Sequence, residues 1–168
     1  MLRLPVPTIA LCDVRTTLAD AARVFGPQKG ASPDHVVELE RRLAADEELR
    51  PYARLPGAGA AGGLGAALAA LGAELVPGAP SVLDLVEFDR HLGDADLVVT
   101  GEGRIDATTI EGKAPAEVAR RSAASAVRCV AFGGRVFVAL PGAETVALSG
   151  DPARAADDLV ELGRRLVA

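Results

Sequence analysis

The chain has 168 residues, of which 49% are hydrophobic but only 3% aromatic, so alanine, leucine and valine must fill its core. This length allows one domain or two small ones, and a net charge of −5 argues against a general surface for nucleic acid or for an anionic membrane. Every apolar stretch long enough to span a bilayer contains charged residues, and the first residues do not form a signal peptide. We therefore expect a cytoplasmic protein.

The first predicted element is a strand over residues 7–14, with Asp13 near its carboxyl end. This aspartate has three open interpretations: a catalytic group, a metal ligand, or a cap of the following turn. A short helix is predicted next, over residues 17–25. The two cysteines, Cys12 and Cys129, each lie in an apolar strand-like run without metal-ligand spacing, so we expect buried, reduced thiols.

A breaker pair, Gly26-Pro27, ends the short helix, and a second helix is predicted over residues 33–50. Ser32 is suited to cap this second helix, and the proline that follows suits its first position. Lys29 lies just before that helix amino terminus, where it either holds an anion or faces the solvent.

Residues 56–68, PGAGAAGGLGAAL, contain a G-x-G-x-x-G string. We reject a dinucleotide site, because the preceding ELRPYARLP is not a buried strand and no convincing βαβ unit surrounds the string. What remains is a glycine-rich loop that leads into a helix of small residues over 61–71. Its free amides would favour an anionic group, and close helix packing explains the same letters equally well.

A short strand is expected at residues 74–76, followed by a helix that Ser81 caps and Gly93 ends. The central stretch comes next, from Asp96 to Lys113. It begins as a buried strand at residues 97–99, which stops at Thr100-Gly101-Glu102-Gly103, where the glycines would let the backbone turn sharply or approach a ligand closely. The charged residues beyond would then lie past the carboxyl end of a parallel strand, where open α/β sheets bind ligands.

The remaining elements complete a βαβ unit with parallel strands. We predict a helix over residues 115–126, a strand over 127–132 that ends at Gly133-Gly134, short strands at 136–140 and 145–148, and a final helix over 152–167.

Three of these segments together resemble the glycerate kinases of bacterial glyoxylate and galactarate pathways. They are VFGPQKGA (residues 24–31), PGAGAAGGLGAAL (56–68) and DLVVTGEGRIDATTIEGKAP (96–115), which occur here in the family's order. The resemblance implies an α/β fold with two domains: a flavodoxin-like domain with a parallel sheet, and a second mixed α/β domain inserted in it. It predicts part of the inserted domain in residues 1–93 and the carboxy-terminal part of the flavodoxin-like domain in residues 94–168.

The resemblance also implies phosphorylation of D-glycerate by ATP with Mg²⁺, usually to 2-phosphoglycerate. Its charged motif residues become candidates for binding and catalysis: Asp13, Lys29, Glu102, Arg104, Asp106 and Lys113. Candidates for nucleotide binding are Gly57, Gly59, Gly62, Gly63, Gly101, Gly103 and Thr109. The lysines would meet phosphate or carboxylate, Arg104 would clamp the glycerate carboxylate, and Glu102, Asp106 or Asp13 would hold Mg²⁺ or accept a proton.

Two departures from the family pattern qualify this expectation. Family members are much longer, and the motifs of their amino-terminal half do not occur here. The Asn-Pro-Leu turn that usually follows Cys-Asp-Val is replaced by Arg15 to Asp20. Three alternatives therefore stay open beside a kinase: a fragment that binds nucleotide or anions without turnover, one half of a split kinase that needs a separate amino-terminal half, and a decayed fragment without function. The partner left open is that separate half or a second copy of this chain in a homo-oligomer.

Overall fold

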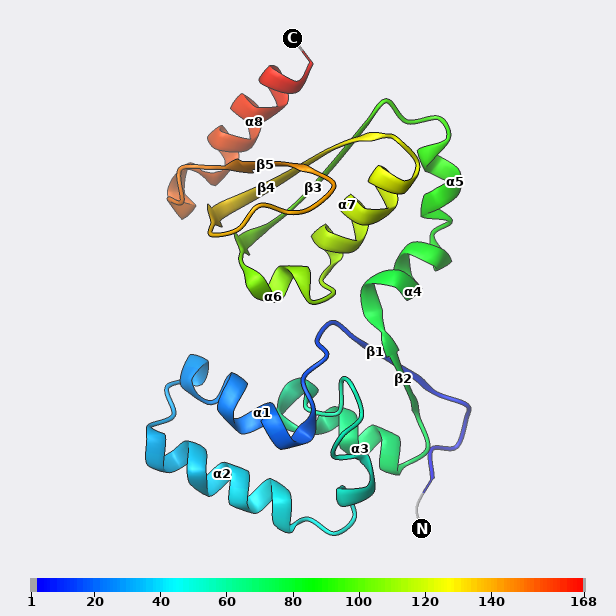
Figure 1. Cartoon of the computed structure of the whole chain (residues 1–168), viewed down its shortest axis with the longest axis vertical. Helices are drawn as coiled ribbons and strands as arrows, with labels where there is room; N and C mark the ends of the chain where they lie inside the picture. Colours follow the sequence, from blue (N-terminus) through cyan, green and yellow to red (C-terminus); the bar gives the residue numbers. More distant parts are fainter. Residues whose placement is uncertain (1–2, 168) are drawn as a thin grey trace. The chain divides into compact units, whose positions relative to one another are not determined.

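A computed structural model describes residues 3–167 of the chain (Figure 1). The protein is mixed α/β and divides into two compact units, residues 1–82 and residues 83–168. Each unit contains a parallel sheet, which confirms the predicted fold class. Which domain of the family each unit represents stays a prediction.

The first unit contains two strands, three helices and the beginning of a fourth. They are β1 (Ile9–Cys12), α1 (Leu18–Phe25), α2 (Pro33–Ala45), α3 (Leu64–Ala70), β2 (Glu74–Pro77) and the start of α4 (Gly78–Leu85), with 3-10 turns at Pro27–Lys29, Arg50–Tyr52 and Ala60–Gly62. Strand β1 pairs in parallel with β2, from Ile9 opposite Glu74 to Cys12 opposite Pro77. Both cysteines are free, Cys129 is buried and Cys12 half-buried, and burial raises the pKa of each thiol.

The core of the first unit forms where the glycine-rich segment packs against α1. Leu18, Ala58 and Ala66 are buried together. A Cβ atom at Gly59 would lie 2.3 Å from the Thr17 carbonyl oxygen, and one at Gly65 would lie 2.2 Å from the Gly57 carbonyl oxygen. Close backbone packing therefore requires glycine at these two positions. The sequence analysis left this explanation open beside anion binding.

Helix α2 ends at Ala45, five residues before the predicted end, because Asp46 leaves the helical conformation. The Asp46 carboxylate accepts hydrogen bonds from the backbone amides of Glu48 and Leu49, both at 3.1 Å. This side chain thus offers the backbone an alternative to further helix.

The prediction that Ser81 caps a helix is wrong. Helix α4 already begins at Gly78, and the Ser81 hydroxyl donates to the Pro77 carbonyl oxygen at 2.8 Å from inside the helix. The predicted single helix is also divided, because Glu87 has a left-handed backbone with φ of 53° and separates α4 from α5 (Phe88–Leu92). Gly93 caps the carboxyl end of α5, as predicted.

The second unit is built around a three-stranded parallel sheet in the order β3-β4-β5. Its further elements are β3 (Leu97–Ile105), α6 (Ala107–Ile110), α7 (Ala114–Ala124), β4 (Arg128–Val136), β5 (Glu144–Ala147), a 3-10 turn at Pro152–Arg154, and α8 (Ala155–Leu166). Helix α7 packs against β3 and β4 (Figure 1). The parallel βαβ unit is confirmed, whereas the strand predicted at 136–140 is absent apart from Val136, which ends β4.

The predicted end of β3 at Gly101 to Gly103 is also wrong, because the strand continues through both glycines to Ile105. Strand β4 likewise continues through Gly133 and Gly134 beside it. A Cβ atom at Gly101 would lie 2.6 Å from the Phe132 ring, and one at Gly134 would lie 2.8 Å from the Gly103 carbonyl oxygen. The glycines therefore make room for the neighbouring strand and its aromatic ring.

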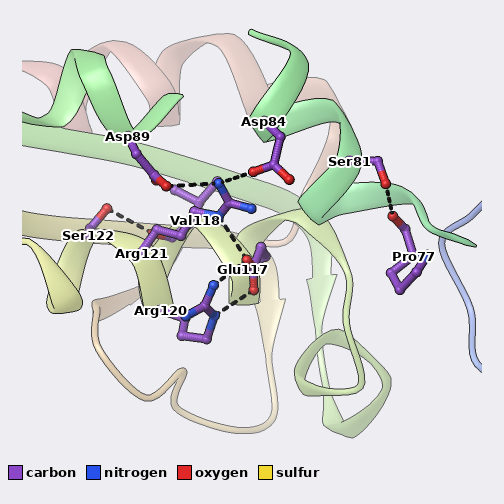
Figure 2. Close-up of polar contacts among 9 residues, drawn as sticks. All are labelled: Pro77, Ser81, Asp84, Asp89, Glu117, Val118, Arg120, Arg121 and Ser122. Atoms are coloured by element: carbon purple, nitrogen blue, oxygen red, sulfur yellow. Dashed lines mark hydrogen bonds and ion pairs between the residues drawn. The ribbon is translucent and has the colours of Figure 1, made fainter. Parts of the chain in front are cut away.

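An arginine with several carboxylate partners joins α4 and α5 to α7 (Figure 2). The side chain of Arg121 is only 9% exposed and contacts Asp84 at 2.6 Å, Asp89 at 3.2 Å and Glu117 at 2.8 Å. Arg120, on the solvent side, also contacts Glu117 at 2.6 Å. The guanidinium groups of Arg120 and Arg121 together hold the pKa of Glu117 below its usual value.

The helices that the structure describes include none that is long and apolar enough to cross a membrane.

Candidate functional site

Five of the predicted site residues come together in the second unit, at the end of β3 and in the segment that follows. Because side chains alternate along a strand, the uninterrupted β3 directs Glu102 and Arg104 to the same face. Asp106 then caps α6, accepting a hydrogen bond from the Thr108 amide at 2.9 Å, and Lys113 precedes α7. Two acidic and two basic side chains thus lie on the last residues of β3 and in the segment that leads to α7.

Thr109 organises this cluster from inside. Its side chain is completely buried, its hydroxyl donates to the Glu102 carboxylate, and the same oxygen accepts a hydrogen bond from the Asp106 amide at 3.1 Å. Because this buried hydroxyl both donates and accepts a hydrogen bond within the protein, it fixes the positions of its two partners. The sequence predicts Thr109 as a nucleotide-binding residue, and that role stays a prediction; in the structure its buried hydroxyl supports Glu102.

Lys113 reaches back to the same carboxylate. Its Nζ lies 3.6 Å from Oε2 of Glu102, while Thr109 occupies Oε1. Both charged side chains remain partly accessible, with 30% and 22% exposed. An amine and a carboxylate held side by side in this way can stabilise a transferring phosphate and accept a proton, respectively.

Arg104 is held on two sides. Its Nε donates to Oδ2 of Asp106 at 2.8 Å, and its guanidinium carbon lies 4.5 Å from the centre of the Phe137 ring. Phe137 follows β4 directly and was missed by the sequence reasoning, because an apolar residue after an apolar run suggests core packing. The structure shows that 58% of Phe137 is exposed, which the sequence pattern does not indicate.

Hydrogen bonds keep Asp106 ionised. The Thr108 hydroxyl and amide, the Arg104 guanidinium and the charge of Lys113 together lower the pKa of Asp106 from 3.8 to about 2. A carboxylate with so low a pKa suits an anchor or a metal ligand, and it is a poor proton acceptor near neutral pH.

This pKa shift predicts an acid-sensitive part of the stability. Because the folded-state pKa lies below the unfolded value, the contribution of Asp106 is complete above about pH 4 and is lost as the pH falls towards 2. Asp106→Asn keeps a capping oxygen and removes the charge, so its stability should change less over that interval. Urea unfolding followed by circular dichroism at pH 6 and pH 2.5 measures the difference, and equal pH dependence in both proteins would contradict the assignment.

The other charged candidates lie in the first unit. Asp13 is exposed just after β1, and the residues that the structure describes provide its carboxylate with no hydrogen bond or ion pair; Thr17, not Asp13, occupies the cap position of α1. Lys29 ends a 3-10 turn and lines a cavity of about 550 Å³ between α1 and α2. The polar side chains of that cavity are Lys29, His35, Glu38 and Arg42.

The glycines predicted to bind nucleotide are largely engaged with the protein itself. The amide of Gly59 donates to the Thr16 carbonyl at 2.9 Å, and those of Gly62 and Gly63 donate within the loop at 3.1 and 3.2 Å. Gly57 packs against Cys12, and Gly101 and Gly103 lie within β3. Their role in phosphate binding stays a prediction.

The donor chemistry of the cluster is compatible with Mg²⁺. Among residues 3–167, no three histidine, cysteine, aspartate or glutamate side chains form a metal site by themselves. Mg²⁺ in kinases commonly takes only one or two carboxylates and completes its shell with phosphates and water. Glu102 and Asp106, both bonded to Thr109, provide that number.

Comparisons with known proteins identify the family of this chain. The sequence model described as the glycerate kinase family matches residues 4–150. Glycerate kinase of Bacillus cereus (strain ATCC 10987 / NRS 248) is 44% identical over 143 residues, which cover 76% of this chain and 36% of that protein. Glycerate 2-kinase of Escherichia coli (strain K12) is 48% identical over 118 residues, or 64% of this chain and 31% of that protein.

A solved structure from the same family also matches this chain. A crystal structure assigned as glycerate kinase 2 of Salmonella typhimurium LT2 matches with a TM-score of 0.54 and 38% identity, covering 82% of this chain and 39% of that one. The chain thus spans little more than a third of the length of the relatives it matches. Family model, relatives and solved structure agree, and the chain belongs to the glycerate kinase family.

Proposed function

We propose that this chain provides part of the active site of an ATP-dependent kinase that phosphorylates D-glycerate, with 2-phosphoglycerate as the product. The observation that carries the proposal is the cluster of Glu102, Arg104, Asp106 and Lys113 at the end of β3. A buried Thr109 links the two acidic residues, and each basic side chain pairs with one of them. The names of the related proteins support the choice of substrate.

Phosphoryl transfer depends mainly on positioning and on the neutralisation of charge. In our assignment a glycerate hydroxyl attacks the terminal phosphorus of ATP, the bond to the bridging oxygen breaks, and ADP leaves. Glu102 accepts the hydroxyl proton, and Lys113 stabilises the charge on the transferring phosphoryl group. Arg104 binds the carboxylate of glycerate.

Asp106 is assigned to Mg²⁺ together with the phosphates, because it stays ionised at neutral pH. When bound, the cation neutralises phosphate charge. Lys29 and the glycine-rich segment belong to the first unit and are proposed to bind phosphate there. This role rests on the family motif and on the position of Lys29 at the edge of a cavity.

A coupled kinase assay with ATP, Mg²⁺ and D-glycerate tests the proposal, on this chain alone and with a co-expressed amino-terminal half of a relative. Turnover in either case supports it, and turnover only with the partner defines a split kinase. Calorimetric titration with ATP or D-glycerate identifies a chain that binds without turnover. A folded chain that neither turns over nor binds in either form would overturn the proposal.

A further inference from the structure

Phe137 is an exposed aromatic side chain without a role in the core. It is the first residue after β4, and 58% of it is exposed. Its amide donates to the Ile105 carbonyl at 2.9 Å, which fixes its backbone against the end of β3. The sheet therefore fixes the backbone position of Phe137, and the guanidinium of Arg104 lies over the face of its ring.

The guanidinium of Arg104 is consequently oriented, and its two terminal nitrogens remain available to a ligand. Phe137 supports its flat face, and Asp106 accepts its Nε–H at 2.8 Å. Asp106 is itself held by the amide and the hydroxyl of Thr108, at 2.9 and 2.7 Å. Within residues 3–167 neither terminal nitrogen of Arg104 has a protein partner, and 62% of the side chain is exposed. The outer edge of the guanidinium, with two parallel N–H donors, thus faces outward ready for a planar anion.

The charge of the surroundings selects the kind of anion. Glu102 and Asp106 carry two negative charges, and Arg104 and Lys113 carry two positive ones, so the cluster is formally neutral. A neutral cluster that offers a planar pair of donors matches a monocarboxylate in shape and charge. A polyphosphate would meet two nearby carboxylates, so it would need the charge of a bound cation, whereas a monocarboxylate needs only Arg104.

We propose that Phe137 is a positioning residue that holds Arg104 as the receptor for the carboxylate of a small hydroxy acid. This inference rests on the proposed function, since it identifies the part of the site that selects the phosphoryl acceptor. The ring acts through Arg104 and does not touch the reacting atoms. It sets the plane of the guanidinium, and thereby the direction from which the carboxylate must approach.

The test compares Phe137→Leu, which removes the π face and keeps an apolar side chain, with Phe137→Tyr, which keeps the face. NMR titrations of the full chain measure the affinities for D-glycerate and for glycerol, which lacks the carboxylate. We expect Phe137→Leu to weaken D-glycerate binding about three- to fivefold, the range of an exposed cation–π contact, and Phe137→Tyr to retain wild-type affinity. Glycerol should show no difference among the three proteins.

A second readout separates positioning from general stability. The ring current of Phe137 should displace the Arg104 Nε–H resonance, and this displacement should vanish in Phe137→Leu and persist in Phe137→Tyr. Unchanged D-glycerate affinity in Phe137→Leu, an equal loss for glycerol, or a wild-type chain that does not bind D-glycerate would each overturn the inference. Binding that follows this pattern without phosphorylation, by the chain alone and with the amino-terminal half, would support the receptor and identify a chain that binds without turnover, so the two proposals can fail separately.

Discussion

Replacing Lys113 by alanine is expected to reduce phosphoryl transfer to D-glycerate about 100-fold or more, the usual result of removing one group that stabilises transition-state charge. The side chain lies 3.6 Å from Glu102 and is 30% exposed, so it is available to a ligand and contributes little to the core. The fold should persist. The measurement is kcat in the coupled assay, in whichever form of the protein shows turnover, together with the thermal midpoint.

Two control variants make this result interpretable. Lys113→Arg keeps the positive charge and should recover part of the rate. Arg128→Ala removes a positive charge from an exposed ion pair with Glu144 in the same unit and should leave the rate unchanged. A Lys113→Ala protein with normal turnover would remove this lysine from the site, and equal losses in Lys113→Ala and Arg128→Ala would indicate a general effect of charge.

Replacing Arg121 by alanine is expected to destabilise the second unit by about 2 kcal/mol, since a guanidinium that is only 9% exposed loses its charge-assisted hydrogen bonds to three carboxylates while Arg120 keeps Glu117 paired. Glu117, whose side chain is only 12% exposed, would lose its contact at 2.8 Å, and α7 would lose its ties to Asp84 and Asp89. Urea unfolding, followed by circular dichroism, measures the change in the free energy of unfolding.

The neighbouring residue provides the matched control. Arg120 contacts the same Glu117 at 2.6 Å, but its own side chain is 64% exposed. Arg120→Ala should therefore destabilise the protein by less than about 1 kcal/mol, as is usual for surface ion pairs. Similar losses in the two variants would show that burial of Arg121 does not determine its contribution.

Helix boundaries followed from the sequence where a local signal decides them. Gly26-Pro27 and Gly93 end helices as predicted, because these residues act through their own backbone. Asp46 ends α2 early through side-chain hydrogen bonds that compete with the helix. Nothing in the pattern of apolar residues distinguishes such an aspartate from one on a solvated helix face.

The glycines show why the rest of the site could not be predicted in the same way. The sequence at Gly101 indicates a sharp turn or a close approach to a ligand, because glycine permits unusual backbone angles. It is a strand residue because the Phe132 ring of the next strand needs the space, a fact of tertiary packing. The cluster of Glu102, Asp106 and Lys113 was nevertheless found, since short spacing in the chain brings these residues together whether the backbone turns or continues.

The course of β3 through the acidic motif has a consequence for the thermodynamics of ligand binding. A phosphate-binding motif on a mobile loop loses its backbone conformational freedom when the ligand arrives. In residues 101–105 that freedom is already lost on folding, and at about 1–2 kcal/mol per residue it amounts to roughly 5 kcal/mol or more. Ligands of this cluster should therefore bind with a small entropic penalty from the protein, and the β3 amides that bond to β4 should resist hydrogen exchange equally with and without ligand.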